Sequence, residues 1–181
     1  MKKGQENKSI QYLVFHGKFD YSSENAIILD AVGRILSTRL LEEIREERSG
    51  VYSIGANPVS SKFPEQEYSI SIYYGTDPEK LEELKQAVFH EINDFIQNGP
   101  SEDELAKAKE KMLREREIAL RENNFWLNIL SNTYYLKKGD FSEFGEFSNI
   151  VPGLTKESIQ QAFKKYFDFS NYVSVALQPA E

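Results

Sequence analysis

Several stretches of the chain alternate apolar and polar residues, and this period of two predicts β-strands. Residues 10–16 are rich in β-branched and aromatic side chains and predict the first strand. Alternation over residues 52–56 and 68–74 predicts two more, and residues 172–177 predict a last strand before Pro179. Strands with one apolar and one polar face are typical of an antiparallel sheet.

Elsewhere the apolar residues recur every three or four positions, the spacing of one face of an α-helix. Ser101 and Glu104 predict a capping box at the start of one helix, and Asp77 and Thr155 are the expected caps of two others. The predicted helices run from Ser22 or Ser23 to Gly50, from Asp77 to Gly99, from Ser101 onward, and over residues 125–135 and 155–166.

The link between the two middle strands, residues 57–67, contains Pro58 and Pro64. It is too long for a tight hairpin, so we expect a surface loop. Strand, helix, two strands, several helices and a last strand describe an α+β domain, with an antiparallel sheet packed on one face by several helices. Residues 10–181 should form this single domain, and the polar residues 1–9 should be a leader or linker.

Charge and composition exclude several classes of protein. The 181 residues include 29 acidic and 22 basic side chains, a formal charge of −7, and the basic ones are mixed among the acids. Nucleic acid is therefore a poor partner. The absence of cysteine excludes disulfides, thiolate metal sites and cysteine nucleophiles. No apolar run is long enough to span a bilayer, so we expect no membrane insertion.

Few residues are candidates for metal or acid–base chemistry. The sequence has two histidines, His16 and His90. His90 and Asp94 could share a helix face, but two ligands do not make a zinc site, which normally needs three from the protein. No nucleophile elbow, phosphate loop or dinucleotide fingerprint is present. We therefore expect no metal site in this chain.

Two acidic clusters, residues 42–47 and 102–104, could supply carboxylate pairs for acid–base catalysis. The first is better explained by ion pairs with Arg39, Arg45 and Arg48 at helical spacings. The second lies where a helix N-terminus favours negative charge. The chain thus shows no complete catalytic apparatus.

The segment Ile-Arg-Glu-Glu-Arg-Ser-Gly-Val-Tyr, residues 44–52, allows two interpretations. In one, the arginines complement the negative end of a helix and Tyr52 simply opens a strand. In the other, the Arg45 guanidinium and the Tyr52 phenol converge beside a strand that can bind an extended peptide, and donate hydrogen bonds to its carbonyl oxygens. Charged helix ends are ordinary, so spacing alone favours the first interpretation.

Residues 36–54, LSTRLLEEIREERSGVYSI, resemble the C-terminal-half domains of the pitrilysin/insulinase family of zinc metallopeptidases. In that family an arginine near the end of a long helix is followed, after six residues that include a glycine, by a tyrosine that opens a strand. Arg45 and Tyr52 have that spacing. The similarity continues in YSISIYYGTDP, in NGPSEDELAKAK and in the ending from LTKESIQQAFKKYF to NYVSVALQP, so it covers the chain from residue 10.

The resemblance implies one domain of a clamshell peptidase built from homologous α+β domains. The zinc site of that family, an inverted H-x-x-E-H with a more distant Glu, belongs to the N-terminal half, and this chain lacks the motif. On this mapping Arg45 holds a substrate carbonyl and Tyr52 helps to stabilise the tetrahedral oxyanion. Arg48 matches no motif position and keeps its structural interpretation, while Gly50 makes the turn between the two.

The implied partners are a peptide substrate and a zinc-binding catalytic half, in the same polypeptide or in a separate subunit. Alone, the chain should not hydrolyse peptides, because nothing in it activates water. The alternative is a catalytically inert peptide-binding or scaffolding subunit on the same fold. We expect a soluble chain; many bacterial relatives of this kind are envelope proteins, which favours a periplasmic parent and leaves a cytoplasmic one open.

Overall fold

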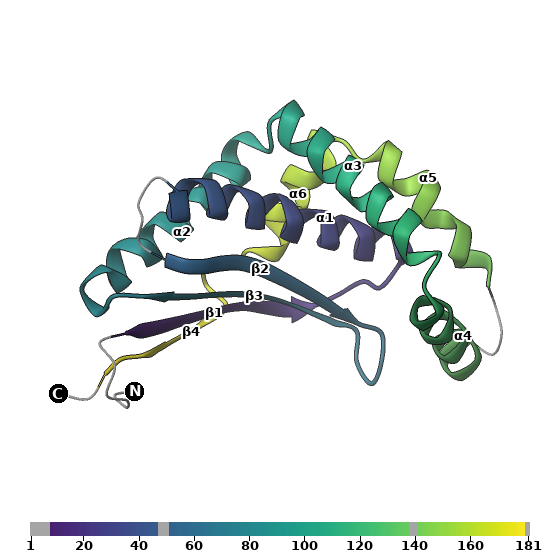
Figure 1. Cartoon of the computed structure of the whole chain (residues 1–181), viewed down its shortest axis with the longest axis horizontal. Coiled ribbons are helices and arrows are strands. Elements are labelled where there is room, and N and C mark those ends of the chain that lie inside the picture. The colour runs from purple at the N-terminus through teal and green to yellow at the C-terminus, as the bar shows by residue number, and fades with distance from the viewer. Residues whose placement is uncertain (1–7, 47–50, 138–140, 180–181) are drawn as a thin grey trace.

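The computed structural model describes residues 8–46, 51–137 and 141–179. Within these ranges, the side chains of seven residues lie outside the description: Arg45, Glu46, Tyr52, Leu136, Lys137, Ser142 and Glu143. The sheet forms one side of the molecule, and the helices pack against one face of the sheet (Figure 1). The predicted α+β class is therefore confirmed.

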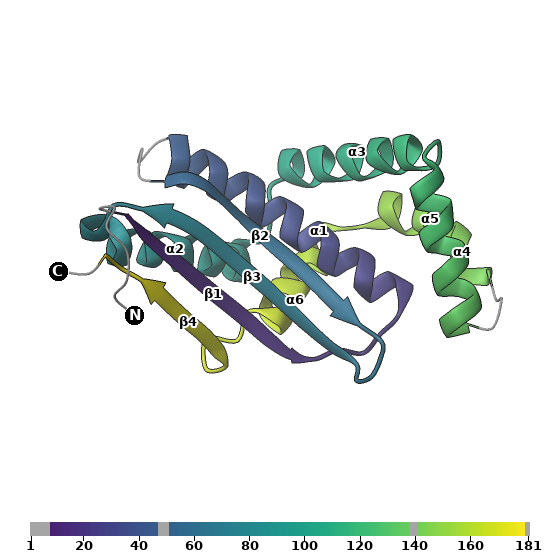
Figure 2. The ribbon, with the colours of Figure 1, turned by 60° about the horizontal axis from the view of Figure 1, so that its bottom comes forward.

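Four antiparallel strands form the sheet, in the order β2-β3-β1-β4, so that β2 and β4 are its edges (Figure 2). All four predicted strands are present, and the first three run longer than expected, β2 most of all. The strands are β1 (Ser9–Lys18), β2 (Val51–Ser61), β3 (Glu67–Thr76) and β4 (Tyr172–Leu177).

The helices include every predicted one and a short one that the sequence pattern did not predict. They are α1 (Ser23–Leu40), which continues as the π-helical turn η1 (Leu41–Glu46), the 3₁₀ turn η2 (Pro78–Lys80), α2 (Leu81–Asn98), α3 (Glu102–Ala119), α4 (Asn123–Lys137), the 3₁₀ turn η3 (Ser142–Gly145), α5 (Glu146–Gly153) and α6 (Lys156–Tyr166). Helix α4 stands at one end of the molecule, away from the two termini (Figure 1).

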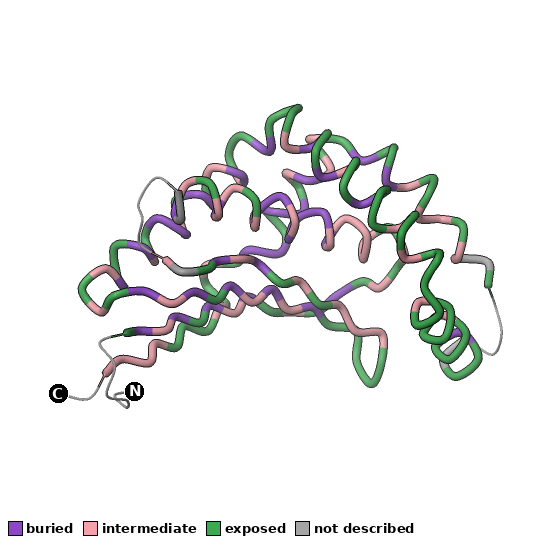
Figure 3. The backbone as a smooth tube through the Cα atoms, viewed as in Figure 1, coloured by how far each residue is buried: buried purple, intermediate pink, exposed green. Residues whose placement is uncertain are grey.

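The core lies between the sheet and the helices, where buried segments face one another (Figure 3). The alternation in β3 is borne out, because Ile70, Ile72 and Tyr74 are fully buried. Leu36 and Leu40 of α1 are also fully buried and belong to the same core cluster. Strand β3 thus turns its apolar face to the helices, whereas Val173 and Val175 of β4 are about half exposed on the open face of the sheet.

The prediction of a surface loop over residues 57–67 is wrong. Strand β2 continues to Ser61 and only residues 62–66 form the turn, with Pro58 paired opposite Ile70 inside the strand. Proline lacks an N–H and is tolerated on an edge strand when its nitrogen faces away from the neighbouring strand. Helix α1 comes very close at this point, since a Cβ added at Gly33 would lie 2.3 Å from the Pro58 Cδ.

The predicted helix caps are confirmed with one exception. Ser22 caps α1, and Ser101 and Thr155 form complete capping boxes on α3 and α6. Asp77 makes no side-chain capping bond, because the chain begins there as a 3₁₀ turn with Pro78 in its first position. The predicted end of the first helix at Gly50 lies outside the described residues.

Candidate functional site

The two candidate residues lie on either side of a change from helix to strand. Arg45 belongs to η1, and Tyr52 is the second residue of β2. Their backbones are described, but their side chains lie outside the described residues, as do Arg48 and Gly50 entirely. The site is therefore defined by the backbone that carries Arg45 and Tyr52 and by the side chains that hold it.

Strand β2 contains an irregularity at Tyr52. Val51 pairs with Thr76, so in a regular antiparallel ladder Ile54 would pair with Tyr73. Ile54 pairs with Tyr74 instead. One residue of β2 is therefore extra between these pairs, which is the definition of a β-bulge. Tyr52 and the exposed Ser53 stand in the bulge. Bulges turn a side chain to a new direction and are frequent beside active sites.

A second irregularity carries Arg45. The last turn of the first helix is π-helical, Leu41–Glu46, rather than α-helical. One-turn π segments are rare and occur often at functional sites, because the wider turn changes which side chains share a face. Ile44 is fully buried and fixes this turn to the core. A helix irregularity and a strand irregularity thus flank the same connection.

The sheet edge beside the candidate site is held by a single serine. Ser37 Oγ accepts a hydrogen bond from the Ala56 N–H at 2.8 Å and donates one to the Ala56 carbonyl at 3.0 Å. Both backbone groups of Ala56 therefore point away from β3 and toward α1. Helix α1 therefore occupies the edge of β2 at this point, where no further strand can pair with Ala56.

The end of α1 that leads to Arg45 is fixed by a cluster of charges. Arg39 binds both carboxylate oxygens of Glu104, at 2.7 and 2.9 Å, and its Nη1 reaches Asp94 at 3.0 Å and Glu91 at 3.3 Å. Its guanidinium carbon also lies 4.4 Å from the centre of the Phe95 ring. The expectation that Arg39 pairs with acids of its own helix is therefore wrong. Arg39 instead connects α1 with α2 and α3.

These contacts change the protonation of the cluster. Burial by itself would raise the pKa of Glu104, but the bonds from Arg39 and Ser101 outweigh it and hold the pKa below its usual range. The pKa of Asp94 is lowered in the same way, against burial, by Asn98 and Arg39. The hydrogen bond to Glu104 raises the pKa of Arg39 most. All three groups stay charged at neutral pH.

Two buried hydroxyls lie at the same end of the sheet. Within the described part of the chain, Ser9 Oγ and Tyr74 Oη are the buried side-chain oxygens without a hydrogen-bond partner. Tyr74 pairs with Ile54 next to the bulge, and Ser9 pairs with Thr76. Burial and the charge of Glu82 raise the pKa of Tyr74 well above its usual range, so its hydroxyl is neutral.

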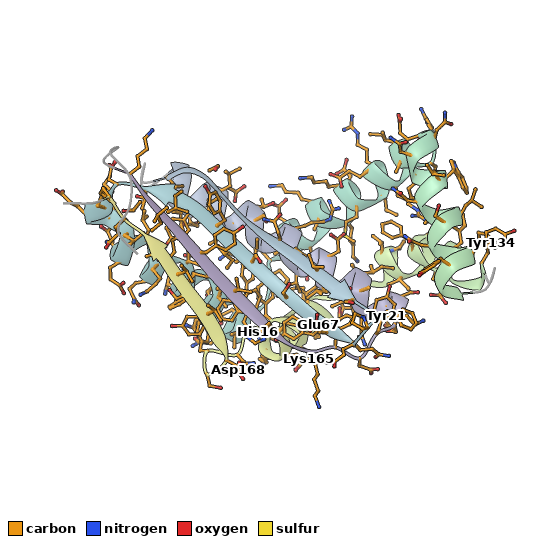
Figure 4. All side chains as sticks on the ribbon, turned by 90° about the horizontal axis from the view of Figure 1, so that it is seen from below. His16, Tyr21, Glu67, Tyr134, Lys165 and Asp168 are labelled. Carbon is orange, nitrogen blue, oxygen red and sulfur yellow. The ribbon has the colours of Figure 1, made fainter. Side chains whose placement is uncertain are left out.

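The two histidines lie on different elements, β1 and α2. Figure 4 shows His16 on the open side of the sheet, near Glu67, and the other histidine, His90, is exposed on α2. Across residues 8–46, 51–137 and 141–179, no three His, Cys, Asp or Glu residues lie close enough to hold a metal ion. In the same ranges no helix is long and apolar enough to cross a membrane.

Sequence reasoning missed Ser37, and it missed the partners of Arg39 on α2 and α3. Ser37 and Arg39 both lie on α1 next to the buried stripe, at positions where a polar side chain has to find a partner. Glu91 is a similar case, because it is a charged residue beside Val88 and Ile92 on the apolar face of α2. A polar residue inside an apolar stripe indicates a contact with another element, but does not say which.

The chain is an α+β domain whose described residues carry no metal-binding cluster. The model of one protein family, described as the Peptidase M16 inactive domain, matches residues 1–112. This match covers more than half of the chain, and the chain belongs to that family.

Similar proteins include a zinc protease-like protein, a periplasmic protease and a peptidase M16 inactive domain. A zinc protease PQQL-like protein of Arabidopsis thaliana is 27% identical over 109 residues, which are 57% of this chain and 11% of that protein. The crystal structure of the periplasmic protease PqqL from Escherichia coli matches 99% of this chain and 20% of its own, with a TM-score of 0.79 and 20% identity.

A peptidase M16 inactive domain from Pseudomonas fluorescens matches 99% of this chain and 43% of its own, with a TM-score of 0.80 and 19% identity. The chain therefore spans well under half the length of each of these proteins. These two structural matches show the same fold over nearly the whole chain, α4 included.

Proposed function

We propose that this chain is the substrate-contacting domain of a zinc metalloendopeptidase that cleaves peptides in an enclosed chamber. Zinc would be held by a catalytic half that belongs to the same polypeptide or to a separate subunit. Residues 10–181 would form the single inactive domain, preceded by a leader or linker. Because one related fold is that of a periplasmic protease, we propose the periplasm as the compartment.

The observation that carries this proposal is the pair of backbone irregularities at one connection. The π-helical turn ends at Glu46 and the bulge holds Tyr52, so both candidate residues leave the regular geometry of their elements. A routine helix end needs neither irregularity. Backbone that departs from regular geometry is common where a side chain has to be aimed at a ligand.

The chemistry of the two side chains supports distinct roles. Arg45 keeps its charge at every physiological pH and can donate to a carbonyl of the substrate, which positions the peptide. Tyr52 offers a neutral O–H donor, suited to an oxygen that becomes more negative as the scissile carbonyl turns tetrahedral. Tyr52 would thus assist the transition state, and Arg45 would bind the substrate in the ground state as well.

The nucleophilic water would be activated by the zinc of the catalytic half. This chain would contribute orientation and hydrogen-bond donors and would exclude water by closing over the peptide. Its own residues supply no metal ligand set among those described. The alternative is an inert peptide-binding or scaffolding subunit that has kept the chamber and lost the chemistry.

A reconstitution experiment separates the two functions. The gene that encodes this chain and its neighbours is searched for H-x-x-E-H, the corresponding catalytic half is purified, and cleavage of a peptide library is measured with and without residues 1–181. The proposal predicts activity that is sensitive to chelators and depends on both halves. A catalytic half that is equally active alone would favour the scaffolding function.

A further inference from the structure

The step from Asn98 to Gly99 is the only Asn-Gly pair in the sequence. Such a pair is the one most prone to deamidation, because glycine has no Cβ to hinder attack of its backbone nitrogen on the asparagine side chain. Asn98 is the last residue of α2 and is exposed. Sequence and exposure alone would therefore predict a reactive asparagine.

The reaction at such a pair needs no partner other than water. The Gly99 nitrogen forms a bond to the Asn98 Cγ and gives up its proton, while the bond from Cγ to Nδ2 breaks and that nitrogen leaves as ammonia. Water then opens the resulting five-membered succinimide at one of its two carbonyls. The product is an aspartate or an isoaspartate, so the modification replaces a neutral amide by a negative charge.

In the folded chain both reacting groups are engaged elsewhere. The Gly99 N–H donates to the Phe95 carbonyl at 3.0 Å, which closes the last turn of α2. Asn98 Nδ2 donates to Asp94 Oδ1 at 2.6 Å. Attack of the Gly99 nitrogen on the Asn98 side chain has to break both bonds, so the closed helix end keeps the pair unreactive.

A side chain from α6 holds this helix end closed. Gln160 Nε2 donates to the Gln97 carbonyl at 2.7 Å and to the Ile96 carbonyl at 3.2 Å. Both belong to the last carbonyls of the helix, which have no partner within the helix itself. Gly99 has a φ of +70° and lies against the same side chain, since a Cβ added there would be 3.3 Å from the Gln160 Cβ. Gln160 thus caps α2 and packs on the glycine.

We propose that Asn98–Gly99 is a latent deamidation site, kept unreactive by the Gln160 cap and opened when the last turn of α2 unfolds. Helix ends are among the segments of native proteins that open most readily. Each opening frees the Gly99 nitrogen and the Asn98 amide together, so the deamidated fraction reports how long this helix end has been open. The inference goes beyond the proposed peptidase function and does not depend on it.

The modification acts on the charge cluster that joins α1, α2 and α3. Asp94 accepts from Asn98 Nδ2 through one carboxylate oxygen and from Arg39 Nη1 at 3.0 Å through the other. Deamidation replaces the donor at position 98 by a second carboxylate four residues from Asp94 on the same helix, where like charges repel. Asp94 loses a partner and gains a repulsive neighbour. A transient opening is thereby converted into a lasting loss of stability.

Mass spectrometry of protease digests tests the site. Residues 1–181 are incubated at neutral pH, folded or in guanidinium chloride, and deamidation at Asn98 is followed with time. The unfolded chain should react at least about tenfold faster than the folded chain. Gln160→Met keeps the side-chain size and removes the donor, and should raise the rate in the folded chain about fivefold. Gln161→Met is the matched control, because Gln161 is exposed and should leave the rate unchanged.

Two results would overturn the inference. One is an equal rate in the folded and the unfolded wild-type chain. The other is a Gln160→Met chain that is folded by circular dichroism and reacts no faster than the wild type. If Gln160→Met does not fold, the comparison of folded with unfolded wild type decides alone.

A second experiment measures the effect of the product on the charge cluster. Asn98→Asp carries the charge of the deamidated chain, and its urea midpoint should lie below that of the wild type. The loss should be smaller when Asp94→Asn is also present, since like charges no longer meet. A loss of the same size with and without Asp94→Asn would contradict the proposed effect on the cluster.

Discussion

Ser37 on α1 satisfies both backbone groups of Ala56 on β2, so one side chain takes the place of a neighbouring strand at the sheet edge. Ala56 is only 5% exposed, and water cannot readily replace these bonds. The contact joins the helix that carries Arg45 to the strand that carries Tyr52. The geometry of the candidate site therefore depends on a residue outside the segment 44–52.

Ser37→Ala should destabilise the fold. It leaves the Ala56 N–H and carbonyl buried without partners, which costs about 1–3 kcal/mol. Urea unfolding measures the loss. Thr38→Ala is the control, because the Thr38 hydroxyl bonds only to the Arg34 carbonyl of its own helix, and a change within about 0.5 kcal/mol is expected. Equal effects of the two variants would contradict the account.

Arg39→Met should destabilise the fold more than Ser37→Ala. The side chains of Arg39, Glu91 and Glu104 are 19%, 11% and 14% exposed, so removal of the cation leaves buried negative charges unpaired. Breaking such a cluster costs about 3–5 kcal/mol. In contrast, Lys85→Met removes a pair with Glu82, which is 69% exposed, and should cost under about 1 kcal/mol.

Acid should weaken the same cluster. The pKa of Glu104 is lower in the folded protein than its ordinary value of 4.5. A carboxylate with a lowered pKa contributes stability that is complete above the ordinary value and is lost as the pH falls through the folded one.

The free energy of unfolding should therefore fall more steeply between about pH 5 and pH 3 in the wild type than in Glu104→Gln. Denaturant titrations at several pH values measure both slopes. Identical slopes would show that Glu104 has the same pKa in the folded and unfolded chain.

Tyr74→Phe should be neutral or stabilising. The Tyr74 hydroxyl is buried without a partner, and removing it relieves a desolvation cost. Tyr68→Phe is the contrasting variant, since Tyr68 Oη donates to the Tyr166 carbonyl at 3.0 Å. Losing that bond should cost about 1 kcal/mol. Thermal unfolding of both variants tests the difference, and a Tyr74→Phe protein that is the less stable would point to a partner for that hydroxyl.

Most of the fold could be predicted because the signals were local. Alternation placed the strands, and the spacing of Ser101 and Glu104 predicted a capping box that the structure contains. The short helix α5 escaped notice because Pro152 and Gly153, at its end, are typical of a loop. The loop prediction over residues 57–67 failed for a related reason, since proline in a strand depends on which strand lies at the edge.

The parts of the candidate site that could not be predicted are contacts between distant residues. Arg39 is 65 residues from Glu104 in sequence, whereas acids on its own helix offered pairs at helical spacing. The bulge at Tyr52 is a property of strand register, which depends on the pairing partner as well as on β2. The family resemblance pointed to Arg45 and Tyr52, and their roles stay predictions.

The kcat of the assembled peptidase with Tyr52→Phe tests the central claim most directly. Removing one donor to the oxyanion should lower kcat about 10²–10³-fold, with little change in KM or in unfolding free energy. Tyr21→Phe, a tyrosine at the other end of the sheet, is the matched control and should retain wild-type kcat. A Tyr52→Phe enzyme with wild-type kcat would contradict the assignment of Tyr52 to the transition state.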